Sequence, residues 1–204
     1  MEHRRFRLRI WEILALVFVI VLLASGVDAI RTQESLSEKV VRLHVLANSD
    51  AEDDQALKLE VRDAILSHAE PLLDSVSDRN EAEAVLRGQL LELEKTAAEV
   101  IRSAGYSYPV TVELAKTDFP TREYPSFSLP AGEYLALRVL IGEAAGQNWW
   151  CVVFPPLCST VAVDFPDTLE NASFSEEEIA FITEEKTEYQ IKFKIIEWFT
   201  AYFE

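Results

Sequence analysis

The sequence predicts an α+β fold in which a small, mostly antiparallel sheet packs against an antiparallel helix pair, with a further helix at the C-terminal end. Three observations predict this class. Residues 40–47 are rich in β-branched side chains, two long amphipathic patterns follow within residues 50–105, and alternating apolar runs return within residues 110–154. Helices and strands that segregate along the chain are typical of α+β proteins.

The composition excludes several functional classes. The 204 residues are 49% hydrophobic with only 6 Gly and 8 Pro, which fits one packed domain rather than a disordered chain. The formal net charge is −16, from 19 Lys+Arg against 35 Asp+Glu. Because nucleic-acid binders gather Lys and Arg on one face, no nucleic-acid partner is expected. An anionic lipid surface is also disfavoured as the main partner.

Residues 1–29 have the layout of an export segment. Basic residues precede the uncharged run 13–24, and Val27 and Ala29 place small side chains at the −3 and −1 positions of a cleavage site. The uncharged run spans roughly 18 Å as a helix, short of the roughly 30 Å of hydrocarbon, whereas residues 10–27 reach about 27 Å. The segment is therefore expected to be a cleaved signal peptide or, if uncleaved, an N-terminal membrane anchor, and the alternative is a buried N-terminal helix. As a signal peptide or an anchor, it would leave the rest of the chain outside the cytosol.

Residues 30–39 are interpreted as a polar connector, and residues 40–204 as a single exported domain that starts with a strand at 40–47. Ser49 is followed three residues later by Glu52, which is the pattern of a capping box, so this pair is predicted to cap the first helix. That helix has one apolar stripe, formed by Leu57, Val61, Ala64, Ile65, His68 and Leu72.

The second helix is predicted to begin at Ser77 or Asp78, because Glu81 stands three residues after Asp78. Apolar side chains keep a helical period as far as Ala104, and Gly105 occupies the position of a C′ glycine. The short polar turn between the two helices predicts an antiparallel pair that lies on a sheet.

Strands are predicted again after Gly105. Residues 110–115 alternate between apolar and polar side chains, residues 117–131 are expected to form a long, aromatic, proline-containing loop, and residues 133–141 form a second alternating strand. Residues 142–146 are expected to act as a β-hairpin connection to a last strand in residues 148–154, whose two faces are both apolar.

The C-terminal part contains one clear cap and one ambiguous stretch. Ser175 and Glu178 have capping-box spacing. Residues 188–203 present an apolar face that fits a helix or a strand, so they are interpreted either as a membrane- or partner-docking element or as an element that closes the sheet.

No catalytic, cofactor-binding or metal-binding constellation is recognised. The sequence has no glycine-rich phosphate loop, no zinc spacing and no Gly-x-Ser-x-Gly elbow. Acidic residues 50–54 alternate like a calcium loop, but Asp53 stands where glycine is required and Leu59 where the bidentate Glu belongs. A nucleophilic pair between a cysteine and His44 has no local support. The chain is therefore expected not to be an enzyme.

The two cysteines, Cys151 and Cys158, allow two interpretations. An extended chain would separate their Cα atoms by roughly 22 Å, whereas a disulfide requires about 4.4–6.8 Å. A disulfide thus needs a chain reversal within residues 154–157, for example through a cis proline. The alternative is two small buried hydrophobic side chains.

Six short motifs between about residues 40 and 158 stand out. They are Arg42-Leu-His-Val-Leu-Ala-Asn-Ser-Asp50, Asp54-Gln-Ala-Leu-Lys58, Val61-Arg-Asp63, Phe119-Pro-Thr, Pro130-Ala-Gly-Glu-Tyr134 and Asn148-Trp-Trp-Cys-Val-Val-Phe-Pro-Pro-Leu-Cys158. Together they resemble the stage II sporulation protein R family. One departure is Pro125 after Tyr124, where the family is expected to carry Gly.

The resemblance implies a signalling protein of endospore-forming bacteria, exported from the forespore into the space between the two membranes. There it would activate a membrane-embedded aspartic protease that processes a sigma-factor precursor. No cofactor is implied, and the oligomeric state is left open.

The docking surface for that protease is predicted where the loop at 119–129 and the segment at 149–158 meet, because aromatic anchors commonly dominate such contacts. The predicted partner-binding residues are Phe119, Tyr124, Phe127, Asn148, Trp149, Trp150, Phe154, Pro155 and Pro156. The alternative function is a cell-envelope glycan-binding module or hydrolase, with the paired Trp as a sugar platform and Glu133 and Glu143 as the nearby carboxylates.

Overall fold

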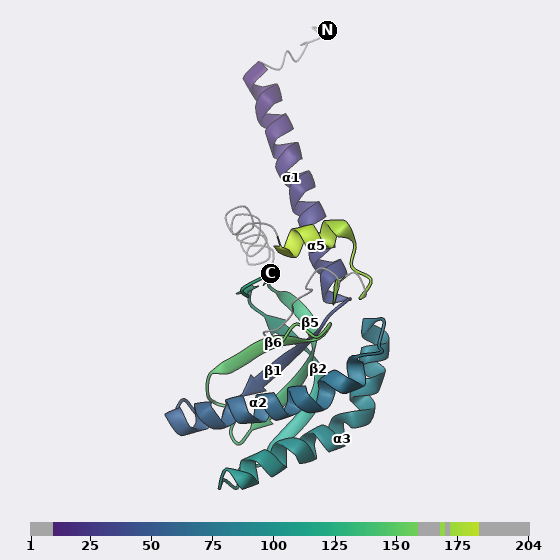
Figure 1. Ribbon diagram of the computed structural model, residues 1–204. Helices are drawn as coiled ribbons and strands as arrows, with labels where there is room; N and C mark the ends of the chain where they lie inside the picture. The colour runs from purple at the N-terminus through teal and green to yellow at the C-terminus, as the bar shows by residue number, and fades with distance from the viewer. Residues whose placement is uncertain (1–9, 159–167, 170–171, 184–204) are drawn as a thin grey trace, which may run out of the picture. The chain divides into compact units, whose positions relative to one another are not determined.

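The computed structural model describes residues 10–158, 168–169 and 172–183, with the backbone alone for 21–30 (Figure 1). The stretch 188–203, predicted as helix or strand, lies outside the described residues. Contacts divide the chain into two units. One contains most of the first helix, and the other, Ser35–Glu184, contains the sheet and the remaining described helices.

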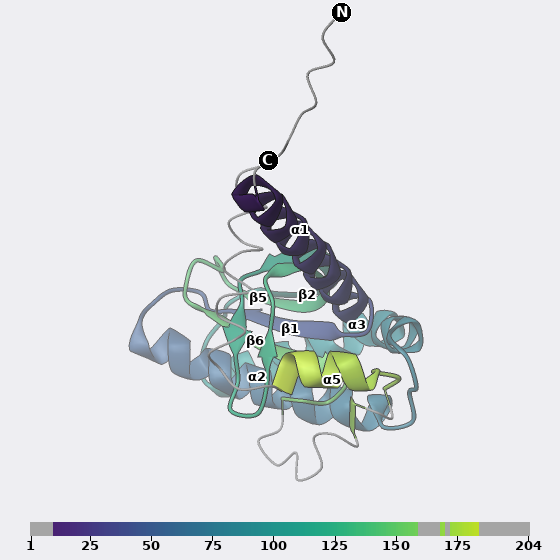
Figure 2. The ribbon, with the colours of Figure 1, turned by 90° about the horizontal axis from the view of Figure 1, so that it is seen from above.

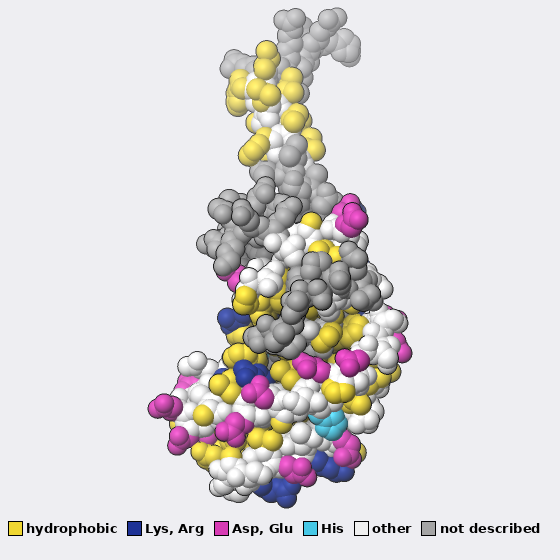
Figure 3. Space-filling view, viewed as in Figure 1, with side chains coloured by type: hydrophobic (Ala, Val, Ile, Leu, Met, Phe, Trp, Pro, Cys, Tyr) yellow, Lys and Arg dark blue, Asp and Glu magenta, His cyan; other side chains and the backbone are white. Residues whose placement is uncertain are grey.

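Helix α1 spans Ile10–Ser37 and so continues through most of the range expected to be a connector. Its described side chains between Ile10 and Ile20 are largely apolar and exposed, and Figure 3 shows them in yellow along the helix. Among the described residues, no helix combines the length and the apolar character needed to cross a bilayer. The assignment of residues 1–29 to export stays a prediction.

The sheet has four strands in the order β2-β5-β1-β6. The strands are β1 (Val41–Leu46), β2 (Val110–Phe119), β5 (Gly132–Ile141) and β6 (Asn148–Phe154). Strand β1 pairs in parallel with β5, whereas β1 with β6 and β2 with β5 are antiparallel. The mostly antiparallel sheet of an α+β fold is thus confirmed, but the predicted hairpin between the last two strands is wrong, because β1 lies between them.

Helices α2 (Glu52–Leu73) and α3 (Arg79–Ser103) lie side by side on one face of the sheet (Figures 1 and 2). Each buries one apolar stripe, since Val61 and Ile65 of α2 and Leu86 and Leu93 of α3 are fully buried. Acidic side chains, magenta in Figure 3, occupy the outer side of the pair. This confirms the predicted antiparallel helix pair.

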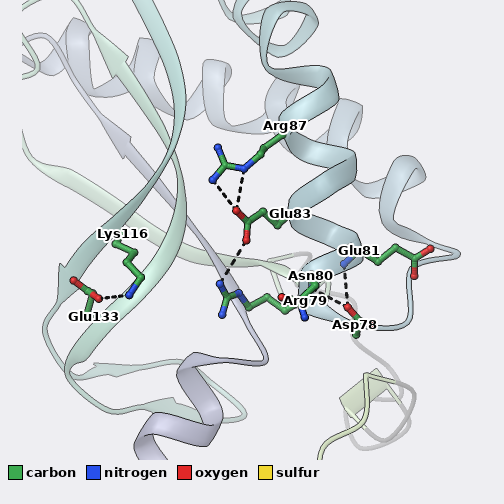
Figure 4. Close-up of polar contacts among 8 residues, drawn as sticks. All are labelled: Asp78, Arg79, Asn80, Glu81, Glu83, Arg87, Lys116 and Glu133. Atoms are coloured by element: carbon green, nitrogen blue, oxygen red, sulfur yellow. Dashed lines mark hydrogen bonds and ion pairs between the residues drawn. The ribbon is translucent and has the colours of Figure 1, made fainter.

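The ends of α3 follow the predicted signals. The Asp78 carboxylate accepts hydrogen bonds from the backbone N–H groups of Asn80 and Glu81, at 2.8 and 3.0 Å (Figure 4). At the other end, Gly105 has φ 88° and donates to Arg102 O, while Tyr106 N donates to Ile101 O. These two bonds form a Schellman motif, which satisfies carbonyl groups of the last turn.

The predicted capping box at Ser49 is wrong. Helix α2 starts at Glu52, its N-cap is Ala51, and no side chain caps it there. The Ser49 hydroxyl instead donates to the buried Asp54 carboxylate at 2.5 Å, which also accepts from Asn48 Nδ2 at 2.8 Å. These hydrogen bonds lower the pKa of Asp54, because they favour the charged carboxylate.

Replacing Asp54 by Asn should reduce the free energy of unfolding by about 1–2 kcal/mol, because a buried charge-assisted acceptor is lost. Denaturant unfolding at neutral pH measures this difference. Asp53→Asn is the matched control, since Asp53 lies in the same helical turn but is exposed. Equal losses in the two variants would show that the helix dipole, and not the Ser49 and Asn48 contacts, explains the effect.

The connection between β5 and β6 passes the end of β1 and is hydrogen-bonded to it. Gly146 N donates to Ala47 O at 3.0 Å, Glu143 N to Asn48 Oδ1 at 3.0 Å, and Gln147 N to Asp50 Oδ1 at 2.7 Å. The segment Asn48-Ser-Asp50 therefore holds both the start of α2 and the crossover connection.

Residues 117–131 are more ordered than the predicted loop. Strand β2 continues to Phe119, and β3 (Arg122–Glu123) pairs with β4 (Ser128–Leu129) in a small antiparallel hairpin. Tyr124 N donates to Phe127 O at 2.7 Å, and the two rings stack with centroids 4.5 Å apart. We refer to residues 122–129 as the β3–β4 hairpin.

Helix α5 (Glu176–Thr183) begins with the predicted capping box. Ser175 N donates to the Glu178 carboxylate at 2.7 Å, and Glu178 N donates to Ser175 Oγ at 3.2 Å. The buried Glu178 also accepts from Lys39 Nζ at 2.6 Å and from the Ser35 hydroxyl at 2.5 Å. Burial would raise the pKa of Glu178, but these hydrogen bonds outweigh it and the pKa is lowered.

Candidate partner-binding face

Polar and aromatic side chains share the face of the sheet opposite α2 and α3. In the strand register, His44 of β1 lies between Arg138 of β5 and Trp150 of β6. Side chains alternate along a strand, so Arg42 projects on the same side as His44. We call this side the arginine face; it comprises Arg42, His44, Phe119, Tyr134, Arg138 and Trp150, with Arg122 and Tyr124 of the β3–β4 hairpin over it.

Arg42 is fully buried and lies between aromatic rings instead of against a carboxylate. Its guanidinium carbon lies 4.1 Å from the ring centroid of Phe119 and 5.0 Å from that of Tyr134. Nη2 donates to the Tyr124 hydroxyl at 2.9 Å, whereas Nε and Nη1 have no hydrogen-bond partner. Burial lowers the pKa of Arg42, because desolvation disfavours the charged form. Cation–π contacts offset part of that cost.

His44 is buried beside Arg42 and contacts two aromatic rings. Its Nε2 donates to the Asn148 side-chain oxygen at 2.7 Å, and its ring centroid lies 5.7 Å from Phe119 and 5.9 Å from Trp150. Burial lowers the pKa of His44, and the hydrogen bond to Asn148 opposes this only in part. The neighbouring cations Arg138 and Arg42 lower it further, so His44 is held neutral.

Acidification should destabilise the fold through His44. Its pKa is lower in the folded chain than the unfolded value of about 6.5, so the unfolded state takes up the proton first. The free energy of unfolding is therefore unaffected above about pH 6.5 and falls below it, by at most about 1.4 kcal/mol per pH unit for one group. Urea unfolding of wild type and His44→Gln between neutral and mildly acidic pH tests this. Equal pH dependence of the free energy of unfolding in the two proteins would contradict it. His68→Gln, which removes a different histidine, is the control.

The structure brings the two predicted docking segments together. The Tyr124 hydroxyl donates to Trp150 O at 3.3 Å, and the Arg122 guanidinium lies 3.8 Å from the Trp150 ring centroid. The predicted residues differ in exposure. Phe119, Phe127, Phe154 and Pro155 are buried, Tyr124, Trp150 and Pro156 are partly buried, and Asn148 and Trp149 are exposed.

Trp149 and Trp150 lie on opposite faces of β6. Trp149 is 36% exposed and packs under Arg62 of α2, whose guanidinium lies 4.2 Å from the ring centroid. Trp150 belongs to the arginine face. The two rings therefore do not form one platform, which removes the basis of the sugar-stacking alternative.

Glu133 and Glu143, the carboxylates of the glycan-binding or hydrolase alternative, make different contacts. Glu133 forms an ion pair with Lys116 at 2.8 Å across β2 and β5 (Figure 4). Glu143 lies in the β5–β6 connection, which is hydrogen-bonded to Asn48. Within residues 10–158, 168–169 and 172–183, no three His, Cys, Asp or Glu side chains gather closely enough to hold a metal ion.

Cys151 and Cys158 form a disulfide bond, with Cα atoms 5.6 Å apart. The chain reverses at Pro155 and Pro156, the Phe154–Pro155 peptide bond is cis, and Leu157 N donates to Val152 O at 3.3 Å. The bond joins the end of β6 to the turn that follows it.

The sequence interpretation missed the cations of the arginine face. Arg42 and His44 alternate with apolar residues in β1, so the pattern did carry a signal of one polar face. The neighbours Arg122 and Arg138 come from segments about 80 and 96 residues further along, and no local pattern joins them to Arg42.

Comparison with known proteins identifies the family. A sequence model of the family described as stage II sporulation protein R (spore_II_R) matches residues 37–164. The stage II sporulation protein R of Bacillus subtilis (strain 168) is 34% identical over 166 residues, which cover 81% of this chain and 69% of that protein. No solved structure matches the chain. The chain belongs to the stage II sporulation protein R family and has a role in sporulation.

Proposed function

We propose that this chain is an exported signalling protein that binds and activates a membrane-embedded aspartic protease, which then processes a sigma-factor precursor. Membership of the sporulation family supports the signalling role, and the layout of residues 1–29 supports export. The proposed site of action is the space between forespore and mother cell. Activation proceeds by protein contact and not by catalysis of this chain's own.

The observation that carries the proposal is the assembly of the β3–β4 hairpin and β6 around Trp150. A partly buried tryptophan flanked by arginine and tyrosine has the composition of interface hot spots, which are enriched in these three residue types. The docking surface is therefore assigned to the Trp150 side of β6. Trp149 lies on the helix side, under Arg62.

Separate Trp150→Ala and Trp149→Ala variants test this assignment. Each is expressed as the full chain in sporulating cells that lack the native activator, and cleavage of the sigma-factor precursor is measured together with the amount of exported protein. We expect Trp150→Ala to reduce cleavage about tenfold or more at normal protein levels, which is the effect of a hot-spot residue.

Trp149→Ala is the matched control, because it removes the same side chain from the opposite face and should leave cleavage near the wild-type level. Normal cleavage by Trp150→Ala with loss in Trp149→Ala would move the docking surface to the helix side. Failure of the wild-type chain to trigger cleavage would overturn the proposed function itself.

A further inference from the structure

The arginine face holds an unusual number of buried polar atoms without a hydrogen-bond partner, and most of them are donors. Among the described residues, the buried side-chain atoms without a partner are Arg42 Nε and Nη1, His44 Nδ1, Arg79 Nε, Arg122 Nε, Arg138 Nε and Trp150 Nε1. All but Arg79 Nε belong to this face, and all of these except His44 Nδ1, which is an acceptor in the neutral ring, are donors. Buried polar groups are nearly always paired, so a group of unpaired donors in one place calls for a ligand that accepts hydrogen bonds.

The charge of this group selects an anion. Arg42 and Arg122 are cationic, and each lies against an aromatic ring. Burial, and to a smaller extent repulsion by Arg122, lowers the pKa of Arg42. No ion pair to either is seen among the described residues, whereas Arg138 is paired with Glu113 at 2.7 Å. Within the part of the chain that the structure describes, the two cations thus have no ion-pair partner, although the net charge of the chain is −16.

We propose that Arg42, Arg122 and Trp150 form a binding site for a carboxylate side chain on an acidic segment of the partner protein. A carboxylate matches the planar fork of an arginine and can accept from the indole N–H at the same time. A nucleic acid or an anionic lipid surface is disfavoured by the overall negative charge. The inference rests on the proposed function, since it supplies the chemistry of that partner contact.

The β3–β4 hairpin covers the site through contacts of Tyr124 with Arg42 and of Arg122 with Trp150. Each of its strands is two residues long, and Tyr124 is the residue that hydrogen-bonds Arg42. The incoming carboxylate replaces the Tyr124 hydroxyl as the acceptor for Arg42 Nη2, and the partly buried Tyr124 side chain turns aside to admit it.

The Trp150 indole N–H gives a direct readout of the site. The full-length chain, labelled with ¹⁵N and held in zwitterionic micelles, is titrated with the blocked peptide acetyl-Gly-Glu-Glu-Glu-Gly-amide at low ionic strength. We expect a saturable shift of the Trp150 indole resonance, assigned with a Trp150→Phe variant. The Trp149 indole, on the opposite face, is the internal control and should not shift.

Two further probes and three variants define the specificity. The matching Gln peptide should not bind, and inorganic phosphate should bind more weakly than the Glu peptide. Arg122→Gln and Arg42→Met should each weaken peptide binding about tenfold or more, which is the loss of one charged hydrogen bond. Arg102→Gln, which replaces an exposed arginine at the end of α3, should bind as wild type.

Arg42→Met should not lower the Tm, because an apolar replacement of a buried unpaired charge is commonly neutral or stabilising.

The proposal is overturned if the Glu peptide fails to shift Trp150, if the Gln peptide or phosphate binds equally well, or if Arg122→Gln binds as wild type. The precursor-cleavage assay in cells distinguishes failure of the carboxylate site from failure of the proposed function. A wild-type chain that triggers precursor cleavage while Arg122→Gln triggers it equally would refute the site alone. Peptide binding by a chain that never triggers cleavage would refute the proposed function alone.

Discussion

Gly146→Ala should destabilise the domain by about 3 kcal/mol or more, a large share of the stability of a typical domain. A Cβ atom at this position would lie 2.2 Å from the backbone oxygen of Ser49 and 2.5 Å from its carbonyl carbon. A flexible side chain could move away, but this backbone cannot, because hydrogen bonds from Gly146 N to Ala47 O and from Gln147 N to Asp50 Oδ1 hold the two segments together.

Urea unfolding of the full chain in micelles, followed by circular dichroism, measures this loss. Gly88→Ala is the matched control, since Gly88 lies inside α3 and an added Cβ would meet nothing within 4 Å. Because alanine favours a helix interior over glycine, this variant should gain about 0.5–1 kcal/mol. A Gly146→Ala variant as stable as wild type would show that the crossover connection is free to shift.

Removal of the Cys151–Cys158 disulfide should be the next largest effect. Replacing both cysteines by alanine frees the turn at Pro155 and Pro156 in the unfolded chain, and a loop of this size contributes about 2–3 kcal/mol in the chain-entropy treatment. For a domain of this length the Tm should fall by about 5–10 °C.

A reducing agent provides the control for the disulfide. It should lower the Tm of the wild-type chain toward that of the double alanine variant and leave the Tm of that variant unchanged. An unchanged wild-type Tm after full reduction, verified by thiol titration, would contradict the expected stabilisation. The same samples in the precursor-cleavage assay would show whether the turn after β6 also serves activation.

Local signals in the sequence were sufficient for most of the elements. Asp78 and Gly105 mark the ends of α3, because a cap depends on contacts within a few residues. The apolar stripes of α2 and α3 identified the helix pair for the same reason. Ser49 was a misleading signal, because its hydroxyl donates to the Asp54 carboxylate and the helix starts two residues later than a capping box at Ser49 requires.

The pairing of strands that lie far apart in the sequence could not be predicted from the hydrophobic pattern. Residues 142–146 have the length of a hairpin loop, yet β1 enters between β5 and β6 and takes both as neighbours. The small hairpin at 122–129 was not predicted because it contains Pro125 and because each of its strands has only two residues. The arginine face was missed because its cations come from two separate strands of the sheet, β1 and β5, and from the hairpin, and only the fold brings them together.

The position of β1 in the sheet has a consequence for how the protein is made. Leu43 pairs with Leu137 and Cys151, so the first strand to leave the ribosome finds its neighbours only after about a hundred more residues have followed. Until then it cannot be completed by hydrogen bonds, and contacts so distant along the chain form slowly. The four-stranded sheet therefore cannot close before residues 132–154 have been synthesised, so most of the polypeptide is made before its central sheet exists.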